Sequence, residues 1–189
     1  MKSLTIAACI FALTLTAFAE THAQLELEVY GRYTVGSEVE PSFCLMADAE
    51  VSEQVDLTYL AITEEEWAES LFGFKYSPAR WVTLGLSTGL EYAPTGLRSR
   101  GSAWFGKGRN SLSLWGEMGE DKESHQYRVA LAYRTSECLT VEAAAWRFHG
   151  IGPVVRYTPK KSDLTIWVMP AHDPEFRETR IILGLCIRL

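Results

Sequence analysis

The sequence predicts an all-β chain that closes into an antiparallel, up-and-down transmembrane barrel, with twelve strands as the favoured number. Three observations predict this class. The last residues carry an aliphatic side chain at every second position from Ile181 to Leu189, which is typical of one apolar face of a strand. Runs of about eight to twelve residues with the same period recur along the chain, and this is the length that a tilted membrane strand needs. Compact turns alternate with longer, mostly acidic connections between these runs.

The terminal strand has two chemically distinct faces. Its opposite face carries Arg180 and Arg188. A shift of one residue would turn both arginines towards the apolar side. If that side lies at the bilayer midplane, each arginine would destabilise the barrel by about 2–4 kcal/mol. The register of this strand is therefore strongly specified. Its aliphatic face is formed by Ile181, Leu183, Leu185, Ile187 and Leu189.

The amino terminus has the pattern of a secretory signal peptide. A single Lys2 precedes an apolar run, and small residues allow cleavage after Ala19 or after Ala23. We favour Gln24 as the first residue of the mature chain, so that residues 1–23 are the signal peptide and residues 24–189 the barrel. Removing 23 of the 189 residues leaves 166, which is enough for one domain.

The mature chain offers no run of about 18 uncharged apolar residues, the length required for a membrane helix. A closed barrel is the other way to span a bilayer, because every backbone polar group must be satisfied within the protein. A secreted β-sandwich is the competing interpretation. The distribution of aromatic residues favours the barrel.

The period-two runs give the expected strands in order. They cover residues 25–35, 42–51, 55–62, 67–76, 81–92, 98–106, 111–118, 125–134, 138–148, 151–158, 163–169 and 177–189. Turn-forming Gly, Pro, Asn and Ser separate them. An even number of strands returns both ends of the barrel to one side of the membrane, together with the compact turns. Ten strands is the alternative, if residues 55–62 and 67–76 form a loop excursion with a helical turn at 63–69.

Aromatic side chains on the outward face should form two belts. Amphipathic rings favour the headgroup level of a bilayer, whereas a sandwich would concentrate them in its core. One belt is predicted to contain Tyr33, Phe43, Tyr92 and Tyr127. The other is predicted to contain Tyr76, Phe105, Tyr133 and Tyr157.

The inward face is predicted to be charged. Acidic residues dominate it in the first five strands and arginines from the sixth strand onwards, so an acidic wall would partly face a basic one. All six tryptophans also fall on this face, where they could stack against sugar rings or fill the lumen. The predicted lumen-lining residues are Arg32, Asp48, Glu50, Asp56, Lys75, Glu91, Arg98, Arg100, Trp104, Trp115, Glu117, Arg128, Arg134, Glu142, Arg156, Trp167 and Arg180.

This charged lining has two interpretations. The first is an open or gated aqueous path whose transverse field orients polar solutes. The second is a plugged interior, in which carboxylates and guanidinium groups pair across the lumen and stiffen the barrel. Barrels of eight strands are filled by side chains and barrels of sixteen leave a channel, so a barrel of twelve lies between them.

The terminal alternation after an export signal resembles the outer-membrane β-barrel proteins of double-membraned bacteria, whose last strand usually ends in Phe where this chain has Leu189. The resemblance implies export to the outer membrane of a Gram-negative bacterium and contact with outer-membrane lipids. It further implies that the aliphatic face of the terminal strand is the insertion signal used by the barrel-assembly machinery. The compact turns and both ends of the barrel would then face the periplasm.

We expect a narrow, monomeric, porin-like channel for small polar solutes, with sugars as one candidate class. The alternative is a non-conducting structural or surface-interaction barrel, and the third hypothesis is an outer-membrane lipid hydrolase. No catalytic residues are assigned, because Ser124 and His125 are consecutive on a strand and point to opposite faces. No metal site is expected, since Cys and His are not clustered at ligand spacing. No cofactor is expected, and the net charge of −6 gives no nucleic-acid signature.

The three cysteines of the mature chain are expected to be free thiols. Their number is odd and their spacing irregular, which does not make a disulfide framework. In the predicted topology Cys44 lies near one rim, whereas Cys138 and Cys186 lie near the other.

Overall fold

The computed structural model describes residues 23–34, 37–93, 95–121 and 124–189. The predicted signal peptide thus lies almost entirely outside the described residues. No helix in the described part of the chain is long and apolar enough to cross a membrane. The described residues form twelve strands: β1 (Ala23–Thr34), β2 (Val39–Ser52), β3 (Val55–Thr63), β4 (Ala68–Ala79), β5 (Val82–Tyr92), β6 (Gly96–Lys107), β7 (Asn110–Met118), β8 (Gln126–Arg134), β9 (Leu139–Trp146), β10 (Gly150–Tyr157), β11 (Leu164–Asp173) and β12 (Glu178–Arg188).

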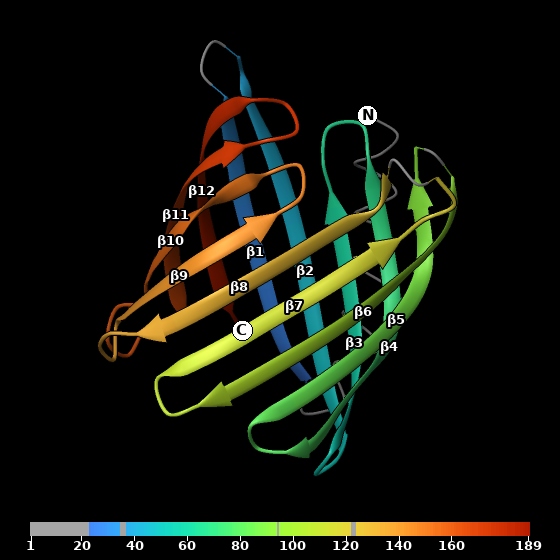
Figure 1. Cartoon of the computed structure of the whole chain (residues 1–189). Coiled ribbons are helices and arrows are strands. Elements are labelled where there is room, and N and C mark those ends of the chain that lie inside the picture. The colour runs from blue at the N-terminus through green and yellow to red at the C-terminus, as the bar shows by residue number, and fades with distance from the viewer. Residues whose placement is uncertain (1–22, 35–36, 94, 122–123) are drawn as a thin grey trace.

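These strands close into an antiparallel barrel (Figure 1). Each strand pairs with the next, and β1 pairs with β12 from Glu26 opposite Arg188 to Thr34 opposite Arg180. Closure leaves no unpaired sheet edge, which a membrane-spanning sheet requires. The prediction of a twelve-stranded barrel is confirmed. The ten-stranded alternative is wrong, because β3 and β4 pair along their length as part of the wall.

The two ends of the barrel differ in their connections. We call the end at which β1 begins and β12 ends the terminal end, and the opposite end the distal end. Five connections lie at the terminal end: those between β2 and β3, β4 and β5, β6 and β7, β8 and β9, and β10 and β11. The distal connections contain Glu38, Glu64, Glu65, Glu120 and Glu175, so the distal rim is acidic.

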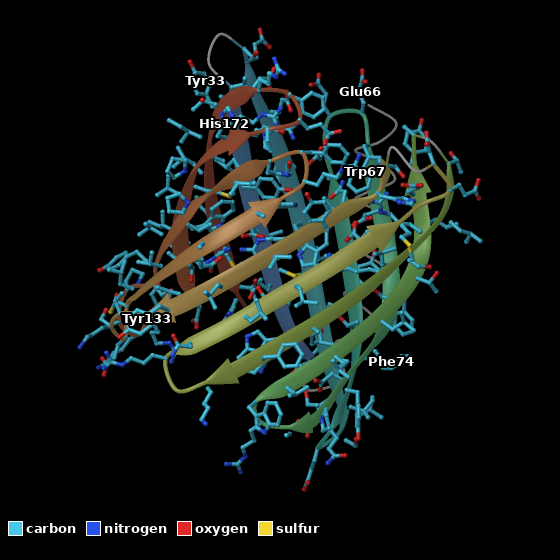
Figure 2. All side chains as sticks on the ribbon, in the orientation of Figure 1. Tyr33, Glu66, Trp67, Phe74, Tyr133 and His172 are labelled. Atoms are coloured by element: carbon cyan, nitrogen blue, oxygen red, sulfur yellow. The ribbon has the colours of Figure 1, made fainter. Side chains whose placement is uncertain are left out.

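The outward face of the barrel is apolar and exposed. In β12 the side chains of Leu183 and Leu185 are 58 % and 48 % exposed, whereas Ile182 between two outward positions is completely buried. Aromatic side chains occupy outward positions near both ends, as Figure 2 shows for Tyr33 at the distal end and Tyr133 at the terminal end. An apolar exterior with aromatic residues at both rims is the surface expected of a barrel surrounded by lipid.

The interior is only partly charged. An apolar cluster fills its middle and distal part along β8 to β12, and includes Met169 and Ile182, which lie opposite each other on adjacent strands. A smaller cluster of Cys44, Leu60 and Leu71 lies inside β2 to β4. The period-two pattern of the sequence predicts that these side chains point inward, but it does not show whether water reaches them. The main cluster consists of Tyr30, Ala130, Ala144, Val154, Trp167, Met169, Ala171 and Ile182.

One glycine makes room for the largest member of this cluster. Trp167 in β11 lies directly opposite Gly184 in β12, and its indole ring covers that glycine. Any side chain at position 184 would overlap the indole ring. This pairing of a large and a small residue allows Trp167 to lie flat against the inner wall.

Candidate functional site

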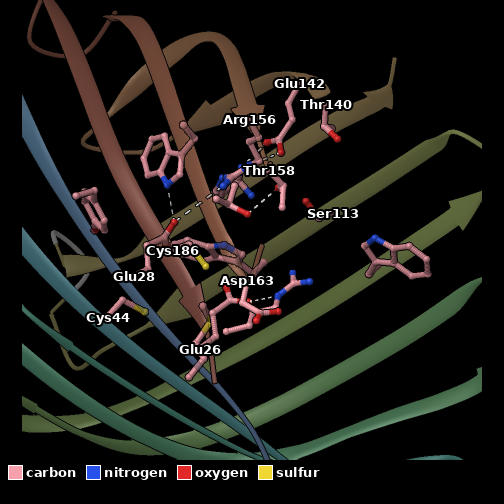
Figure 3. Close-up of a pocket in the computed structure, with 18 of the residues that line it drawn as sticks. Glu26, Glu28, Cys44, Ser113, Thr140, Glu142, Arg156, Thr158, Asp163 and Cys186 are labelled. Carbon is pink, nitrogen blue, oxygen red and sulfur yellow. Dashed lines mark hydrogen bonds and ion pairs between the residues drawn. The ribbon is translucent and has the colours of Figure 1, made fainter. Parts of the chain in front are cut away.

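A cavity of about 850 Å³ occupies the lumen towards the terminal end (Figure 3). It reaches the terminal turns, because Glu137, Cys138, Ser162 and Asp163 line it. Eight of the predicted lumen residues form part of its wall. They are Arg100, Trp104, Trp115, Arg128, Arg134, Glu142, Arg156 and Trp167.

The cavity does not extend to the distal end. Its most distal lining residues are Tyr30, Ile62 and Trp146, and among the described residues none from a distal connection lines it. Tyr30 and Trp146 belong to or pack against the apolar cluster that fills the interior beyond them. The described lumen is therefore a chamber that opens at the terminal end and is closed towards the distal end.

Three arginine–tryptophan pairs recur around the chamber wall. The guanidinium carbon of Arg100 lies 4.3 Å from the ring centroid of Trp115, and Arg156 lies 5.2 Å from Trp167. The third pair, Arg128 and Trp146, is separated by 5.8 Å. Register produces the pairs formed by Arg128 and Arg156, because each is directly opposite its tryptophan on an adjacent strand. Such cation–π contacts contribute about 0.5–2 kcal/mol each.

Carboxylates bridge these arginines. Glu142 accepts hydrogen bonds from Arg128 Nη2 at 2.7 Å and from Arg156 Nε at 2.6 Å. Glu28 accepts a hydrogen bond from Trp167 Nε1 at 2.7 Å and lies 4.0 Å from Arg156. Most of these ion pairs join neighbouring strands along the wall rather than opposite walls. The charged residues can therefore be paired while the centre of the chamber stays open.

The tryptophans are poor platforms for sugar rings. The ring of His149 stacks on Trp146, with ring centroids 3.7 Å apart and an interplanar angle of 10°. The guanidinium group of Arg128 also lies over the ring of Trp146. Trp167 is 2 % exposed. Trp81, predicted to face inward, lies in the turn between β4 and β5 and is 59 % exposed, so strand alternation does not apply to it. Trp104, at 39 % exposure, is the most accessible tryptophan of the chamber wall.

Three further predicted lumen residues belong to a buried ionic cluster instead of the chamber wall. Arg98 lies within an ion-pair distance of three carboxylates: 2.8 Å from Glu69, 2.6 Å from Glu91 and 3.1 Å from Glu117. Each of these four side chains is at most 1 % exposed. The ring of Trp67 lies 5.1 Å from the guanidinium carbon. The cluster fills the distal interior of β4 to β7.

Arg32 and Arg180 hold the distal connection between β9 and β10. Both donate hydrogen bonds to the carbonyl oxygen of Phe148, which has a positive φ of 67°. Arg180 also pairs with Asp173 at 2.8 Å, and Arg32 pairs with Glu40. Neither arginine lines the chamber. Both act as structural clamps on this connection.

The same connection turns His149 into the barrel. Its ring is 4 % exposed and stacked on Trp146. The histidine is buried because the connection between β9 and β10 is short and folds inward. Burial, together with the charge of Arg32, lowers the pKa of His149 to about 3. His149 is therefore neutral at physiological pH.

The remaining predicted lumen residues lie near the terminal end of β2 to β4 and outside the chamber wall. Lys75 pairs with Asp48 at 2.6 Å and lies opposite Asp56. Glu50 lies opposite Asp56 and is exposed. These residues form an acidic sector of the terminal rim.

The three described cysteines are free. Cys44 and Cys186 both lie directly opposite Glu28, on the two strands that flank β1. The prediction that they lie near different rims is therefore wrong. Two intervening strand spacings, about 9.6 Å, exceed the distance that a disulfide spans. In the described chain no group of three or more His, Cys, Asp and Glu side chains could hold a metal ion.

Comparison with known proteins supports the fold. No protein-family model matches the chain, and no curated protein sequence matches it either. Among solved structures, it is similar to the KdgM porin, with 11 % identity, a TM-score of 0.57 and coverage of 86 % of this chain and 98 % of the porin. It is also similar to the COG4313 outer membrane channel from Pseudomonas putida F1, with 9 % identity, a TM-score of 0.55 and coverage of 88 % and 95 %.

A third similar structure is the outer membrane phospholipase A from Escherichia coli, with 11 % identity, a TM-score of 0.53 and coverage of 88 % and 93 %. The chain therefore has the fold of outer-membrane β-barrels. At these identities the similarity concerns the fold alone.

Proposed function

We propose that this protein is a porin-like barrel of the Gram-negative outer membrane that admits small polar solutes into its lumen from the periplasmic, terminal end. The observation that carries the proposal is the chamber of about 850 Å³ with its wall of paired arginines and carboxylates. At about 30 Å³ for each water molecule, it has room for roughly 28 waters. A solute the size of a monosaccharide would fit with part of its hydration shell.

The fold and the exterior support the membrane location. The apolar outward face and the two aromatic rims suit a lipid environment. Outer-membrane lipids are thus the proposed surroundings of the barrel. We further propose that residues 1–23 direct export and that the barrel-assembly machinery recognises the aliphatic face of the terminal strand, as their sequence patterns predict.

The chamber wall favours polarity over one sign of charge. It contains five arginines and five carboxylates, which balance one another. Field lines from such a wall orient dipoles but do not strongly favour anions over cations. We therefore propose that selectivity in the chamber is for small polar solutes of either sign.

Passage through the barrel requires the distal interior to open. Tyr30 lies where the chamber meets the apolar cluster and is 4 % exposed. In the proposed channel this residue and its neighbours form the barrier. Removing the phenol ring should widen the contact between the chamber and the distal interior.

Conductance in planar bilayers tests the proposal. The refolded barrel should give discrete steps of low conductance, and Tyr30→Ala should give larger or more frequent steps. Tyr157→Ala, at an exposed outward position of the terminal rim, is the matched control and should leave conductance unchanged. If neither the native chain nor Tyr30→Ala gives conductance steps although the barrel is folded and heat-modifiable, the proposal of a channel is contradicted.

Such silence would favour the second candidate, a non-conducting structural or surface-interaction barrel. The closed distal interior is the observation that favours it.

An outer-membrane lipid hydrolase is the third candidate, because one similar fold belongs to a phospholipase. In the described chain no histidine is hydrogen-bonded to a serine, and His149 contacts the carbonyl oxygen of Arg147 instead. Loss of a phospholipid substrate on incubation, abolished by His125→Ala, would support the hydrolase.

A further inference from the structure

A second cavity, of about 280 Å³, lies at the terminal end beside the chamber. Three terminal turns surround it: Arg80 lies in one, Lys107 to Asn110 form the next, and Arg134 borders the third. Trp104, Arg134 and Thr140 line both this cavity and the chamber. The smaller cavity is therefore positioned as a side pocket at the entrance of the lumen.

Its lining is positively charged. Four lining residues are cationic, namely Arg80, Lys107, Arg109 and Arg134, and no described carboxylate lines it. This composition contrasts with the chamber, where arginines and carboxylates are balanced. The acidic sector of the terminal rim belongs to β2, β3 and β4, whereas these cations lie at or near turns from β4 to β9.

None of the four cations has an ion-pair partner within the described chain, although most of the other described lysines and arginines do. Arg109 makes one long hydrogen bond, of 3.5 Å, to the carbonyl oxygen of Thr135. Cations gathered around a concave surface without carboxylates raise the local potential and attract anions. Their unused donors can bind an anion through charge-assisted hydrogen bonds.

Two neutral features complete the site. The indole ring of Trp104 lies over Gly106, and both residues line the cavity. The side chain of Trp104 is 39 % exposed, so part of it remains available for contact. Ser111 and Thr140 add hydroxyl groups to the lining. A phosphate with an attached ring or short polyol could meet all three kinds of group.

We propose that this side pocket binds the phosphate group of a small phosphorylated solute at the periplasmic entrance of the lumen. Its volume equals that of about nine water molecules, which fits a phosphate ester and excludes a polymer. A phospholipid headgroup could supply the same chemistry, but Trp104 and Arg134 line both cavities and so place the pocket beside the aqueous chamber, which favours a solute. The site deepens the proposed function and rests on it for the periplasmic side of the pocket and for the passage of the solute.

Calorimetric titration of the refolded full chain with inorganic pyrophosphate, in a zwitterionic detergent at low ionic strength, tests the site. We expect saturable binding that weakens with added salt. Arg109→Gln and Arg134→Gln should each weaken binding about fivefold, and the double variant at least tenfold. Lys161→Gln is the matched control, because Lys161 lies in another terminal turn, has no ion-pair partner among the described residues and does not line the cavity. It should bind like the native chain.

Absence of pyrophosphate binding, or equal weakening by Lys161→Gln and Arg109→Gln, would overturn the proposal. A second arm uses nanodiscs of phosphatidylcholine with or without phosphatidylglycerol. Loss of pyrophosphate binding only in phosphatidylglycerol would identify a lipid headgroup as the occupant and overturn the solute site. Binding without conductance would support this site while the channel fails, and conductance without binding would overturn this site alone.

Discussion

The Nη1 atom of Arg98 lies 2.6 Å from Oε2 of Glu91, at a place where neither side chain is exposed to solvent. Glu69 and Glu117 share the same guanidinium group. A single cation thus compensates several carboxylates in the distal interior, assisted by Arg100, which pairs with Glu117 at 2.9 Å. The stability of this half of the barrel should depend strongly on Arg98.

Replacing Arg98 by Met should therefore destabilise the barrel by about 3–5 kcal/mol, because it leaves buried carboxylates without their cation. The free energy of unfolding from urea titration in micelles measures the effect. Arg109→Met, at an exposed site without an ion pair, is the control and should change this free energy by less than about 0.5 kcal/mol. Equal stability of the two variants would contradict the structural role of the cluster.

Trp167→Phe tests the hydrogen bond at the chamber wall. The change removes the Nε1–H that donates to Glu28 Oε1 at 2.7 Å and weakens the stacking of Arg156. A buried acceptor without its donor costs about 1–3 kcal/mol, so the midpoint of urea unfolding should fall accordingly. Trp81→Phe provides the comparison, since Trp81 is 59 % exposed and its indole makes no hydrogen bond in the described structure. The idea fails if both variants unfold at the same midpoint.

The strands and their faces could be predicted because the signals are local. Alternation identified Ile181 to Leu189 as one strand, and turn residues separated the others. The distances between Arg98 and its carboxylates depend on the relative register of four strands, which no local pattern contains. Tyr30 and Met169 lie on the same strand faces as the predicted lumen residues Arg32 and Trp167, but alternation does not indicate that they pack into an apolar barrier. The site was thus predictable as a face but not as a chamber with one closed end.

Thiol labelling should distinguish the mouth of the chamber from its wall. Cys138 lies at the terminal turn between β8 and β9 and is partly exposed, whereas Cys44 and Cys186 are 5 % and 6 % exposed. A membrane-impermeant methanethiosulfonate should react with Cys138 at least about tenfold faster than with Cys44 or Cys186, because thiol reactivity requires access as well as ionisation. Mass spectrometry of time points measures the three rates.

Single-cysteine chains provide the control for this labelling, since each reports one site. Cys138 should also be protected when the reagent is confined to the distal side of oriented proteoliposomes. Labelling of Cys138 from the distal side at the terminal-side rate would contradict the closed distal interior.

The last prediction concerns acid stability. The pKa of His149 is about 3 in the folded chain, because burial and the charge of Arg32 disfavour its protonated form, against about 6.5 when unfolded. Between these values the unfolded chain binds the extra proton. The stability associated with neutral His149 is therefore complete above about pH 6.5 and is lost as the pH falls towards 3. The loss is roughly 4–5 kcal/mol over the whole window and about 2 kcal/mol by pH 5.

His149→Phe isolates this contribution. Phenylalanine can keep the stack on Trp146, at a centroid distance of 3.7 Å in the native chain, but binds no proton. The free energy of unfolding, measured from pH 7 to pH 4, should fall less steeply for the variant than for the native chain, since carboxylates contribute equally to both. Phe148→Leu, in the same connection, should retain the native slope because His149 is still present. Parallel pH profiles for His149→Phe and the native chain would show that this histidine is already solvated in the folded barrel, so that the inward fold of the connection between β9 and β10 would have to be abandoned.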